Sequence, residues 1–219
     1  MFTESPEPGD PASLDRLLEV WPGASRIVRC HDSRFGATEF NPGIGRGRFH
    51  PFYPLQGHRR QPVPTIYGAG DFDGALSETV FHNIPVGVPL SAVERAVRRS
   101  TLKPMLVSVI APLRDLTLVQ LHGYGLPRLG LHRADLIDCE PDHYERTARW
   151  AQALHAAGDV DGLVWVSRQH DSSRALVLFG DRVARRDLAI AEPPLPLYLG
   201  LGFAQVQAAA EKAGITLFE

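Results

Sequence analysis

The chain has 219 residues, of which 44% are hydrophobic, so it is long enough to bury a sizeable core and a single domain is expected. Its formal net charge of -2 gives no general attraction to nucleic acid or to an anionic membrane, and neither is a predicted partner. Cys30 and Cys139 form no CxxC pair, which argues against a disulfide framework or a zinc knuckle. The N-terminal segment does not resemble a signal peptide, and no apolar run approaches the roughly 18 residues of a membrane span. A cytoplasmic protein is predicted.

The first part of the chain combines a tail, a short helix, a strand and a long loop. Residues 1–12 are acidic and rich in proline, which predicts a disordered tail, with the domain over residues 13–219. Ser13 is suited to cap a helix. The apolar side chains that would share one face of this helix are Leu14, Leu17, Leu18 and Trp21. Residues 26–31, RIVRCH, predict a strand. Residues 32–64 lack periodicity and are rich in Gly, Pro, His and Arg, which predicts a functional loop.

A strand and a helix are predicted after this loop. Residues 64–69, PTIYGA, predict the strand, and Asp71 is suited to cap the helix that carries Glu78. Glu78 is unusual because its neighbours on the helix, Ala75, Leu76, Val80 and Phe81, look like a buried face. Another helix is predicted over residues 91–100, SAVERAVRRS.

The rest of the chain mixes strands and helices. Residues 105–111 and 115–121 are predicted to form neighbouring strands joined through Pro112. Residues 142–157 predict the clearest helix, with an apolar stripe formed by Tyr144, Ala148, Ala151 and Leu154. The remaining predicted elements are strands at 161–167 and 174–180, a helix at 203–214 and a strand at 215–218. Because strands and helices do not strictly alternate, an α+β fold with a mixed sheet and flanking helices is expected.

Several common site motifs are not supported. The segment GIGRGRF, residues 43–49, lacks the preceding strand and following helix of a dinucleotide fingerprint, so it is interpreted as a flexible loop that presents Arg46 and Arg48. There is no HExxH pair to predict a metal site and no GxSxG elbow to predict a serine hydrolase.

What remains is a dispersed set of polar side chains: Arg29, Arg48, Tyr67, Glu78 and Ser167. A sugar phosphate would use these residue types coherently, since arginines grip phosphate, a tyrosine ring packs on a base, and a carboxylate stabilises positive charge at an anomeric carbon. Each residue also has an ordinary interpretation. The arginines suit surface ion pairs, the tyrosine suits a core, and the serine suits the end of a strand. The pattern alone leaves the choice open.

Four blocks of sequence in a fixed order resemble the RES domain family, which is named for an arginine, a glutamate and a serine. The blocks are RIVR, FNPGIGRGRFHPF, PTIYGAGDFDGALSETVFHN and DGLVWVSRQHDSSRALVLFGDR. The resemblance implies Arg48, Glu78 and Ser167 as catalytic residues, and Arg29 and Tyr67 as substrate-binding residues. The chain departs from the family pattern at Cys30, where many relatives carry an aromatic residue. It also has Arg48, Phe49 and His50 in place of an RWN-like triplet.

The resemblance implies a fold like that of ADP-ribosyltransferases and a toxin restrained by an Xre-like helix-turn-helix antitoxin, with homo- or hetero-oligomers as an option. It implies NAD+ as the substrate, cleaved between nicotinamide and ribose by hydrolysis or by phosphorolysis, with inorganic phosphate as a co-substrate and no further cofactor. Glu78 would stabilise the oxocarbenium-like transition state, Arg29 and Arg48 would bind the pyrophosphate, Tyr67 would pack on the nicotinamide or its ribose, and Ser167 would donate a hydrogen bond. The secondary candidates are His31, His50 and Arg168. The alternatives are a protein ADP-ribosyltransferase and a catalytically silent, partner-binding domain.

Overall fold

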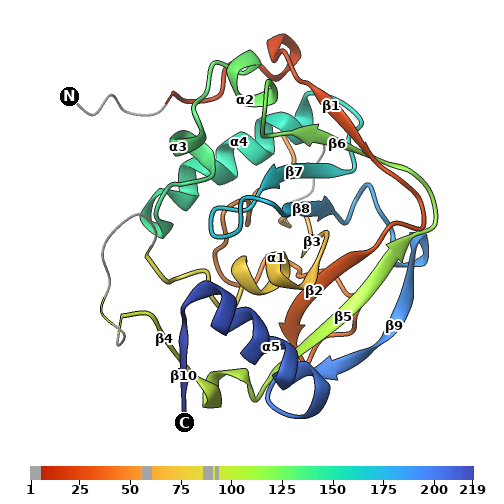
Figure 1. Ribbon diagram of the computed structural model, residues 1–219. Coiled ribbons are helices and arrows are strands. Elements are labelled where there is room, and N and C mark those ends of the chain that lie inside the picture. The colour runs from red at the N-terminus through yellow and green to blue at the C-terminus, as the bar shows by residue number, and fades with distance from the viewer. Residues whose placement is uncertain (1–5, 56–60, 86–90, 92–93) are drawn as a thin grey trace.

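The computed structural model describes residues 6–55, 61–85, 91 and 94–219. Its centre is an eight-stranded mixed sheet with the strand order β1-β6-β7-β8-β3-β2-β5-β9 (Figure 1). The strands are β1 (Leu18–Trp21), β2 (Ile27–Asp32), β3 (Thr65–Ala69), β5 (Met105–Pro112), β6 (Leu116–Gln120), β7 (Gly162–Val166), β8 (Arg174–Phe179) and β9 (Leu188–Pro196). All neighbours pair antiparallel except β6 and β7, which are parallel. A separate parallel pair is formed by β4 (Ala96–Arg98) and β10 (Thr216–Phe218).

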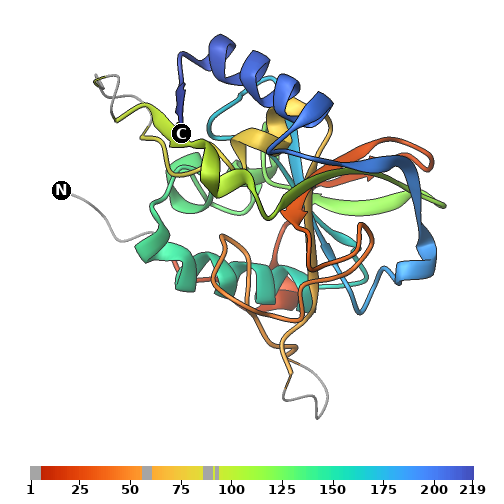
Figure 2. The same ribbon diagram turned by 90° about the horizontal axis from the view of Figure 1, so that it is seen from below.

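Helices cover one face of the sheet in two separate places. The α-helices are α1 (Phe72–Ser77), α2 (Gly125–Arg128), α3 (Arg133–Leu136), α4 (Tyr144–Ala156) and α5 (Gly200–Ala213). The 3-10 turns are η1 (Pro11–Ser13), η2 (Arg99–Leu102), η3 (Pro141–His143) and η4 (Arg185–Asp187). Helix α4 packs over β6, β7, β8 and β3, whereas α1 and α5 pack over β2 and β5. Figure 2 shows α4 and α5 well apart, each against its own part of the sheet. The α+β fold with flanking helices is thus confirmed, and its likeness to ADP-ribosyltransferases stays a prediction.

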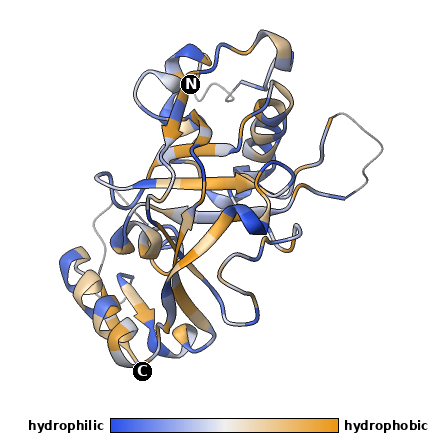
Figure 3. Cartoon of the chain, turned by 90° about the vertical axis from the view of Figure 1, so that its right-hand side faces the viewer, coloured by the Kyte–Doolittle hydropathy of each residue, from blue (hydrophilic) through white to orange (hydrophobic). Residues whose placement is uncertain are grey.

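The alternation of side chains along the strands separates the cores on the two faces. On β3, Tyr67 packs with the α4 core, whereas Ile66 belongs to a smaller core on the opposite face. Loop residues Ala37 and Phe40 and the side chain of Val183 cover this second core. In Figure 3 the strands are mainly orange and the connecting segments are mainly blue or white, as expected for a sheet that is buried on both faces.

Most predicted elements are confirmed within one to three residues. The strands predicted at 26–31 and 64–69 are β2 and β3, and the clearest predicted helix is η3 followed by α4. The strands at 161–167 and 174–180 are β7 and β8, and the C-terminal helix and strand are α5 and β10. These segments share long apolar runs or strong periodicity, which is the pattern that local sequence encodes best.

Three predictions are wrong. The helix expected after Ser13 does not form: the short turn η1, capped by Asp10, ends at Ser13, and residues 18–21 form β1 because they pair with β6. In the described part of 91–100, β4 replaces the expected helix because residues 96–98 pair with β10. Strands β5 and β6 are not neighbours, since β5 lies between β2 and β9 whereas β6 lies between β1 and β7. In each case a partner distant in sequence decides the local structure.

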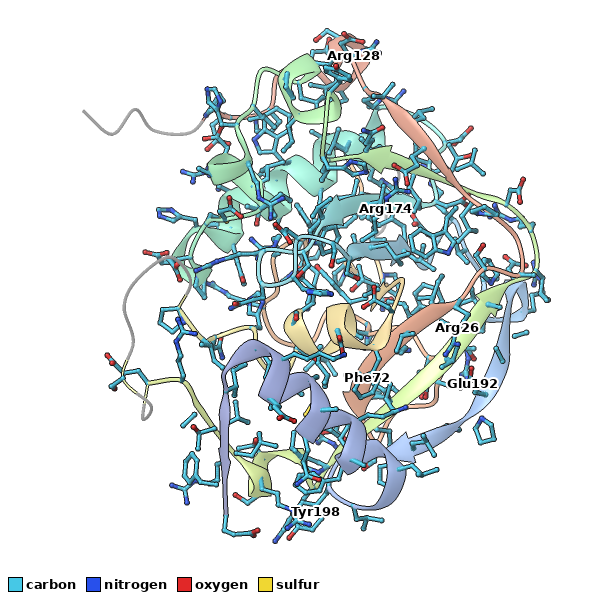
Figure 4. All side chains as sticks on the ribbon, in the orientation of Figure 1. Arg26, Phe72, Arg128, Arg174, Glu192 and Tyr198 are labelled. Carbon is cyan, nitrogen blue, oxygen red and sulfur yellow. The ribbon has the colours of Figure 1, made fainter. Side chains whose placement is uncertain are left out.

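Strand β9 was not predicted from the sequence, because its three prolines argue against a strand. It forms nonetheless at one edge of the sheet. Proline lacks the N–H that a central strand needs and is tolerated at an edge. Arg26, directly before β2, and Glu192, on β9, form an exposed ion pair of 2.9 Å (Figure 4). Because β5 lies between β2 and β9, this pair spans β5.

The predicted tail falls partly outside the described residues, which begin at Pro6. The described part contacts α4, where the indole N–H of Trp150 donates to the carbonyl of Pro6 at 2.9 Å and Arg149 forms an ion pair with Glu7. The division into a disordered tail and a domain stays a prediction. Within the described residues, no helix is both long and apolar enough to span a membrane.

Candidate active site

A cavity of about 470 Å³ opens between the two helical covers of the sheet. Strands β2, β3 and β7 contribute its floor, α1 and the turn after it contribute one wall, and the start of α4 with the loop of residues 46–50 contributes the other. Its volume lies in the range of small-molecule sites. The polar side chains that line it are Arg29, Arg46, Arg48, His50, Tyr67, Glu78, Thr79, His82, Asn83 and Tyr144.

Glu78 enters this cavity because α1 ends at this residue. The side chain of Asp71 accepts the backbone N–H of Gly74 at 2.7 Å and caps the helix, as predicted. The apolar positions of α1, such as Leu76, pack on the sheet, and Glu78 is the C-cap residue whose half-buried carboxylate lines the cavity. Its Oε1 accepts the backbone N–H of Arg168 at 3.3 Å, which ties the carboxylate to the turn after β7. A carboxylate among apolar neighbours is therefore explained by the end of the helix, and the expectation that Val80 and Phe81 continue the helix is wrong, since α1 ends at Ser77 and both lie in the turn after it.

Arg48 is buried, with 3% of its surface exposed, and no carboxylate of the described residues pairs with it. One terminal nitrogen donates to the carbonyl of Leu136 at 3.1 Å, and the guanidinium lies 5.5 Å from the centre of the Tyr144 ring. Its Nε and its other terminal nitrogen have no partner in the described structure. The hydroxyl of Thr147 on α4 donates to the backbone carbonyl of Arg48 and holds this part of the loop in place. A buried cation with two unused donors is suited to an anionic ligand.

Arg29 lies on β2 and is also buried, at 7% exposure. One of its terminal nitrogens donates to the backbone carbonyls of Ala37 and Glu39 at 2.8 and 2.9 Å, which orients the guanidinium from the loop side. Its Nε has no partner among the described residues. Loss of hydration lowers the pKa of Arg29 to about 10, so the side chain remains charged at neutral pH. The cavity therefore contains two buried positive charges.

Tyr67 stands on β3 and organises the arginine loop. Its hydroxyl oxygen accepts the backbone N–H of Phe49 at 2.9 Å and lies 3.2 Å from Nδ1 of His50. Burial raises the pKa of Tyr67, so the phenol stays protonated. The ring also packs edge-on against Trp165. Tyr67 thus lines the cavity and holds the backbone next to Arg48.

A pair formed by His82 and Tyr144 was missed by sequence reasoning. The Nε2 of His82 lies 2.6 Å from the hydroxyl of Tyr144, and both residues line the cavity. Desolvation, and then the nearby Arg48, lowers the pKa of His82, so the imidazole is neutral at pH 7. The two residues are separated by 62 positions in sequence, and no local pattern connects them.

Cys30, the first of the two departures from the pattern of the family that the chain resembles, lies on the cavity wall. Burial raises the pKa of its thiol to about 12, so it is a neutral, small side chain at physiological pH. The second departure is the triplet of Arg48, Phe49 and His50, in which His50 lines the cavity and contacts Tyr67, whereas Phe49 is fully buried and packs on Trp165. The departures at Cys30 and His50 therefore lie in the site.

Ser167 is not among the described residues that line the cavity. It is fully buried at the end of β7, its backbone N–H donates to the carbonyl of Ser173 at 2.9 Å, and its hydroxyl has no partner in the described structure. The next residue is Arg168, whose N–H contacts Glu78. The structure therefore brings Arg29, Arg48, Tyr67 and Glu78 together and leaves the serine behind the wall, next to the segment that holds Glu78.

The other secondary candidates lie outside the cavity wall. His31 does not line the cavity. Its Nδ1 donates to the carbonyl of Asp32 at 3.0 Å, and its Nε2 accepts from the hydroxyl of Ser108 at 2.8 Å. Arg168 forms an ion pair of 2.7 Å with Glu140. Both side chains are engaged in structural contacts.

The comparison with protein families identifies the family of the chain. A family model described as the RES domain matches residues 26–199, which is most of the chain and includes every residue discussed above as part of the cavity. No curated protein matches the sequence.

Proposed function

The chain belongs to the RES domain family, and from this premise we propose that it cleaves NAD+ at the bond between nicotinamide and ribose. The observation that carries the proposal is the combination of two buried arginines without carboxylate partners and one carboxylate in a single cavity. Arginine is suited to the two phosphates of a dinucleotide, and a carboxylate is suited to the positive charge that develops on a ribose ring.

In the proposed reaction, the unused donors of Arg48 and Arg29 bind the pyrophosphate and fix the position of the nicotinamide ribose beside Glu78. The bond between the nicotinamide nitrogen and the anomeric carbon then breaks. Its electron pair remains on nitrogen, so the positively charged pyridinium leaves as neutral nicotinamide. The carboxylate of Glu78 stabilises the oxocarbenium-like ribose during this step, as carboxylates do in glycoside cleavage.

An acceptor then forms the new bond to the anomeric carbon. Water loses a proton and yields ADP-ribose, whereas inorganic phosphate yields ADP-ribose 1″-phosphate. Tyr67 keeps the loop and its arginine in position through the N–H of Phe49. We assign Ser167 to the support of the turn that holds Glu78, because its hydroxyl lies behind the cavity wall.

The RES domain family is associated with toxin–antitoxin systems. We extend the proposal accordingly: loss of NAD+ makes the protein toxic to the cell that contains it, and a helix-turn-helix partner restrains it. The neutral side chains of Cys30 and His82 are compatible with a cavity that binds an anionic dinucleotide.

The test is to incubate the purified protein with NAD+, with and without inorganic phosphate, and to identify the products by mass spectrometry. Glu78→Gln keeps the size of the side chain and removes its charge, so we expect kcat to fall by about 10²–10³-fold. Glu192→Gln, on the exposed edge strand, is the matched control and should keep full activity. Intact NAD+ in the wild-type reaction, or undiminished loss of NAD+ in Glu78→Gln, would refute the proposal. Transfer of labelled ADP-ribose to protein would instead support the alternative acceptor.

A further inference from the structure

A second, smaller cavity of about 240 Å³ adjoins the candidate active site. The two cavities share Arg46, His50 and Tyr144 in their walls. The smaller one continues along α4, where its lining consists of Pro51, Phe52, Tyr53, Glu145, Ala148, Arg149 and Gln152. The two charged residues of this set, Glu145 and Arg149, form an ion pair with each other at 3.1 Å. The volume of the smaller cavity is below the roughly 300 Å³ at which independent ligand pockets begin. We therefore treat it as an extension of the larger cavity.

Two side chains of the smaller cavity, Tyr53 and Gln152, are of the kind that bind a nucleobase. Tyr53 is 49% exposed and presents an aromatic ring for which the protein itself provides little cover. The amide nitrogen of Gln152 donates to the backbone carbonyl of Tyr53 at 2.6 Å, which holds the two residues together. The amide oxygen of Gln152 remains an acceptor for an amino group. Stacking on an exposed ring and one amide contact are typical of the recognition of a base.

Arg46 lies at the boundary of the two cavities. It is exposed, and no ion pair or hydrogen bond of its side chain occurs in the part of the chain that the structure describes. Arg48, two residues later, is buried in the larger cavity. The loop thus places one positive charge inside the larger cavity and another between the cavities. A ligand with an anionic linker between two ring systems matches this arrangement of charge.

We propose that the smaller cavity is a binding site for the adenosine half of a dinucleotide, with Tyr53 stacking on the base, Gln152 contacting its edge and Arg46 contacting the linking phosphates. This inference rests on the proposed function, because the larger cavity is taken to hold the nicotinamide ribose beside Glu78. It adds the location of the second half of the substrate and the residues that distinguish a dinucleotide from a mononucleotide.

The test compares two unreactive ligands, ADP-ribose and ribose 5-phosphate, by isothermal titration calorimetry with the full-length protein. Only ADP-ribose has an adenosine, so it should bind at least tenfold more tightly. Tyr53→Ala should weaken ADP-ribose by about tenfold, which is within the range for the loss of one base–aromatic stack, and should leave ribose 5-phosphate within about twofold. Tyr124→Ala removes an 81% exposed tyrosine that is not among the lining residues of either cavity, and it should change neither affinity.

In the calorimetry, any of three results would overturn the inference: equal affinities for the two ligands, no detectable binding of either, or the same loss for both ligands in Tyr53→Ala. Kinetics separate this inference from the proposed function. If the protein cleaves NAD+ and Tyr53→Ala keeps the wild-type KM, the adenosine site is refuted while the activity stands. If NAD+ stays intact but the ADP-ribose pattern holds, the activity is refuted and the site stands. If both the activity and the adenosine site hold, Tyr53→Ala should raise the KM for NAD+ and leave the KM for nicotinamide mononucleotide unchanged.

Discussion

At the scale of single residues, Arg48 is the most informative side chain in the protein. Removing a charge from water is costly, and proteins normally compensate by pairing it with an opposite charge. Arg48 instead has the carbonyl of Leu136, the ring of Tyr144 and two unused donors. A bound phosphate would supply the opposite charge that the protein itself does not place beside Arg48. The residue is therefore expected to contribute more to ligand binding than to folding.

We predict that Arg48→Lys lowers kcat/KM for NAD+ by about 30-fold, because lysine keeps the charge and loses the fork of parallel donors that matches phosphate. The matched control is Arg26→Lys, at the exposed ion pair with Glu192 shown in Figure 4. It should stay within about twofold of the wild type. Steady-state kinetics over a range of NAD+ concentrations measure both. Full activity of Arg48→Lys would show that the unused donors are not needed.

Ser167 gives a second prediction for a single residue. Its hydroxyl is buried and has no hydrogen-bond partner in the described structure. Ser167→Ala therefore removes a polar group that loses its hydration on folding and forms no hydrogen bond in return. We expect the free energy of unfolding to stay the same or to rise by about 1 kcal/mol, and kcat/KM for NAD+ to change less than about threefold. Urea denaturation and steady-state kinetics test this. A tenfold rise of KM would show that the hydroxyl reaches the substrate.

At the scale of the elements, the site depends on how α1 packs between β3 and the turn after β7. Gly74 in α1 lies against Ser173, and a Cβ at position 74 would come within 2.0 Å of the serine Oγ. Glycine inside a helix normally costs about 0.5–1 kcal/mol relative to alanine. Here the glycine is favourable despite that cost, because its lack of a Cβ allows α1 to pack directly against Ser173 in the segment between β7 and β8.

We predict that Gly74→Ala destabilises the protein by about 1–3 kcal/mol through overpacking. The double variant Gly74→Ala/Ser173→Gly removes the clashing hydroxyl and should recover most of this loss relative to Ser173→Gly alone. Chemical denaturation of the four proteins gives the coupling free energy. Additive effects of the two substitutions would contradict the contact between these residues.

At the scale of the whole molecule, three buried or half-buried histidines make the fold sensitive to mild acid. Desolvation lowers the pKa values of His31, His50 and His82, and Arg29 lowers that of His31 further. The unfolded chain therefore binds more protons than the folded chain below about pH 6.5. The stability that these residues contribute is present above that pH and is lost as pH falls through the lowered pKa values.

We predict that the free energy of unfolding decreases between pH 7 and pH 5, a range above the ordinary pKa values of the carboxylates. His31→Gln can keep the contact with Ser108 but cannot titrate, so it should reduce the slope of stability against pH. Urea denaturation at several pH values measures the slope in both proteins. A stability that is flat from pH 7 to pH 5 would contradict the assignment of neutral, buried histidines.

Much of the fold was predictable because its signals are local. The apolar runs of β2, β3, β7 and β8, the periodicity of α4 and the cap at Asp71 each depend on a few adjacent residues. Strands β1 and β4 were not predictable in this way, since they exist through pairing with β6 and β10. Strand β9 contains prolines that only an edge position tolerates.

By itself, the sequence determined the fold class and the family, and it pointed to Arg29, Arg48, Tyr67, Glu78 and the secondary candidate His50, all of which line the cavity. Only the tertiary structure decided that Arg48 is buried without a carboxylate, that Ser167 lies behind the wall, and that His82 meets Tyr144. The physical reason is the distance along the sequence over which each interaction acts. Propensity, capping and hydrophobic periodicity act within a few residues, whereas burial, charge pairing and the shape of a cavity depend on segments that meet only after the sheet has formed.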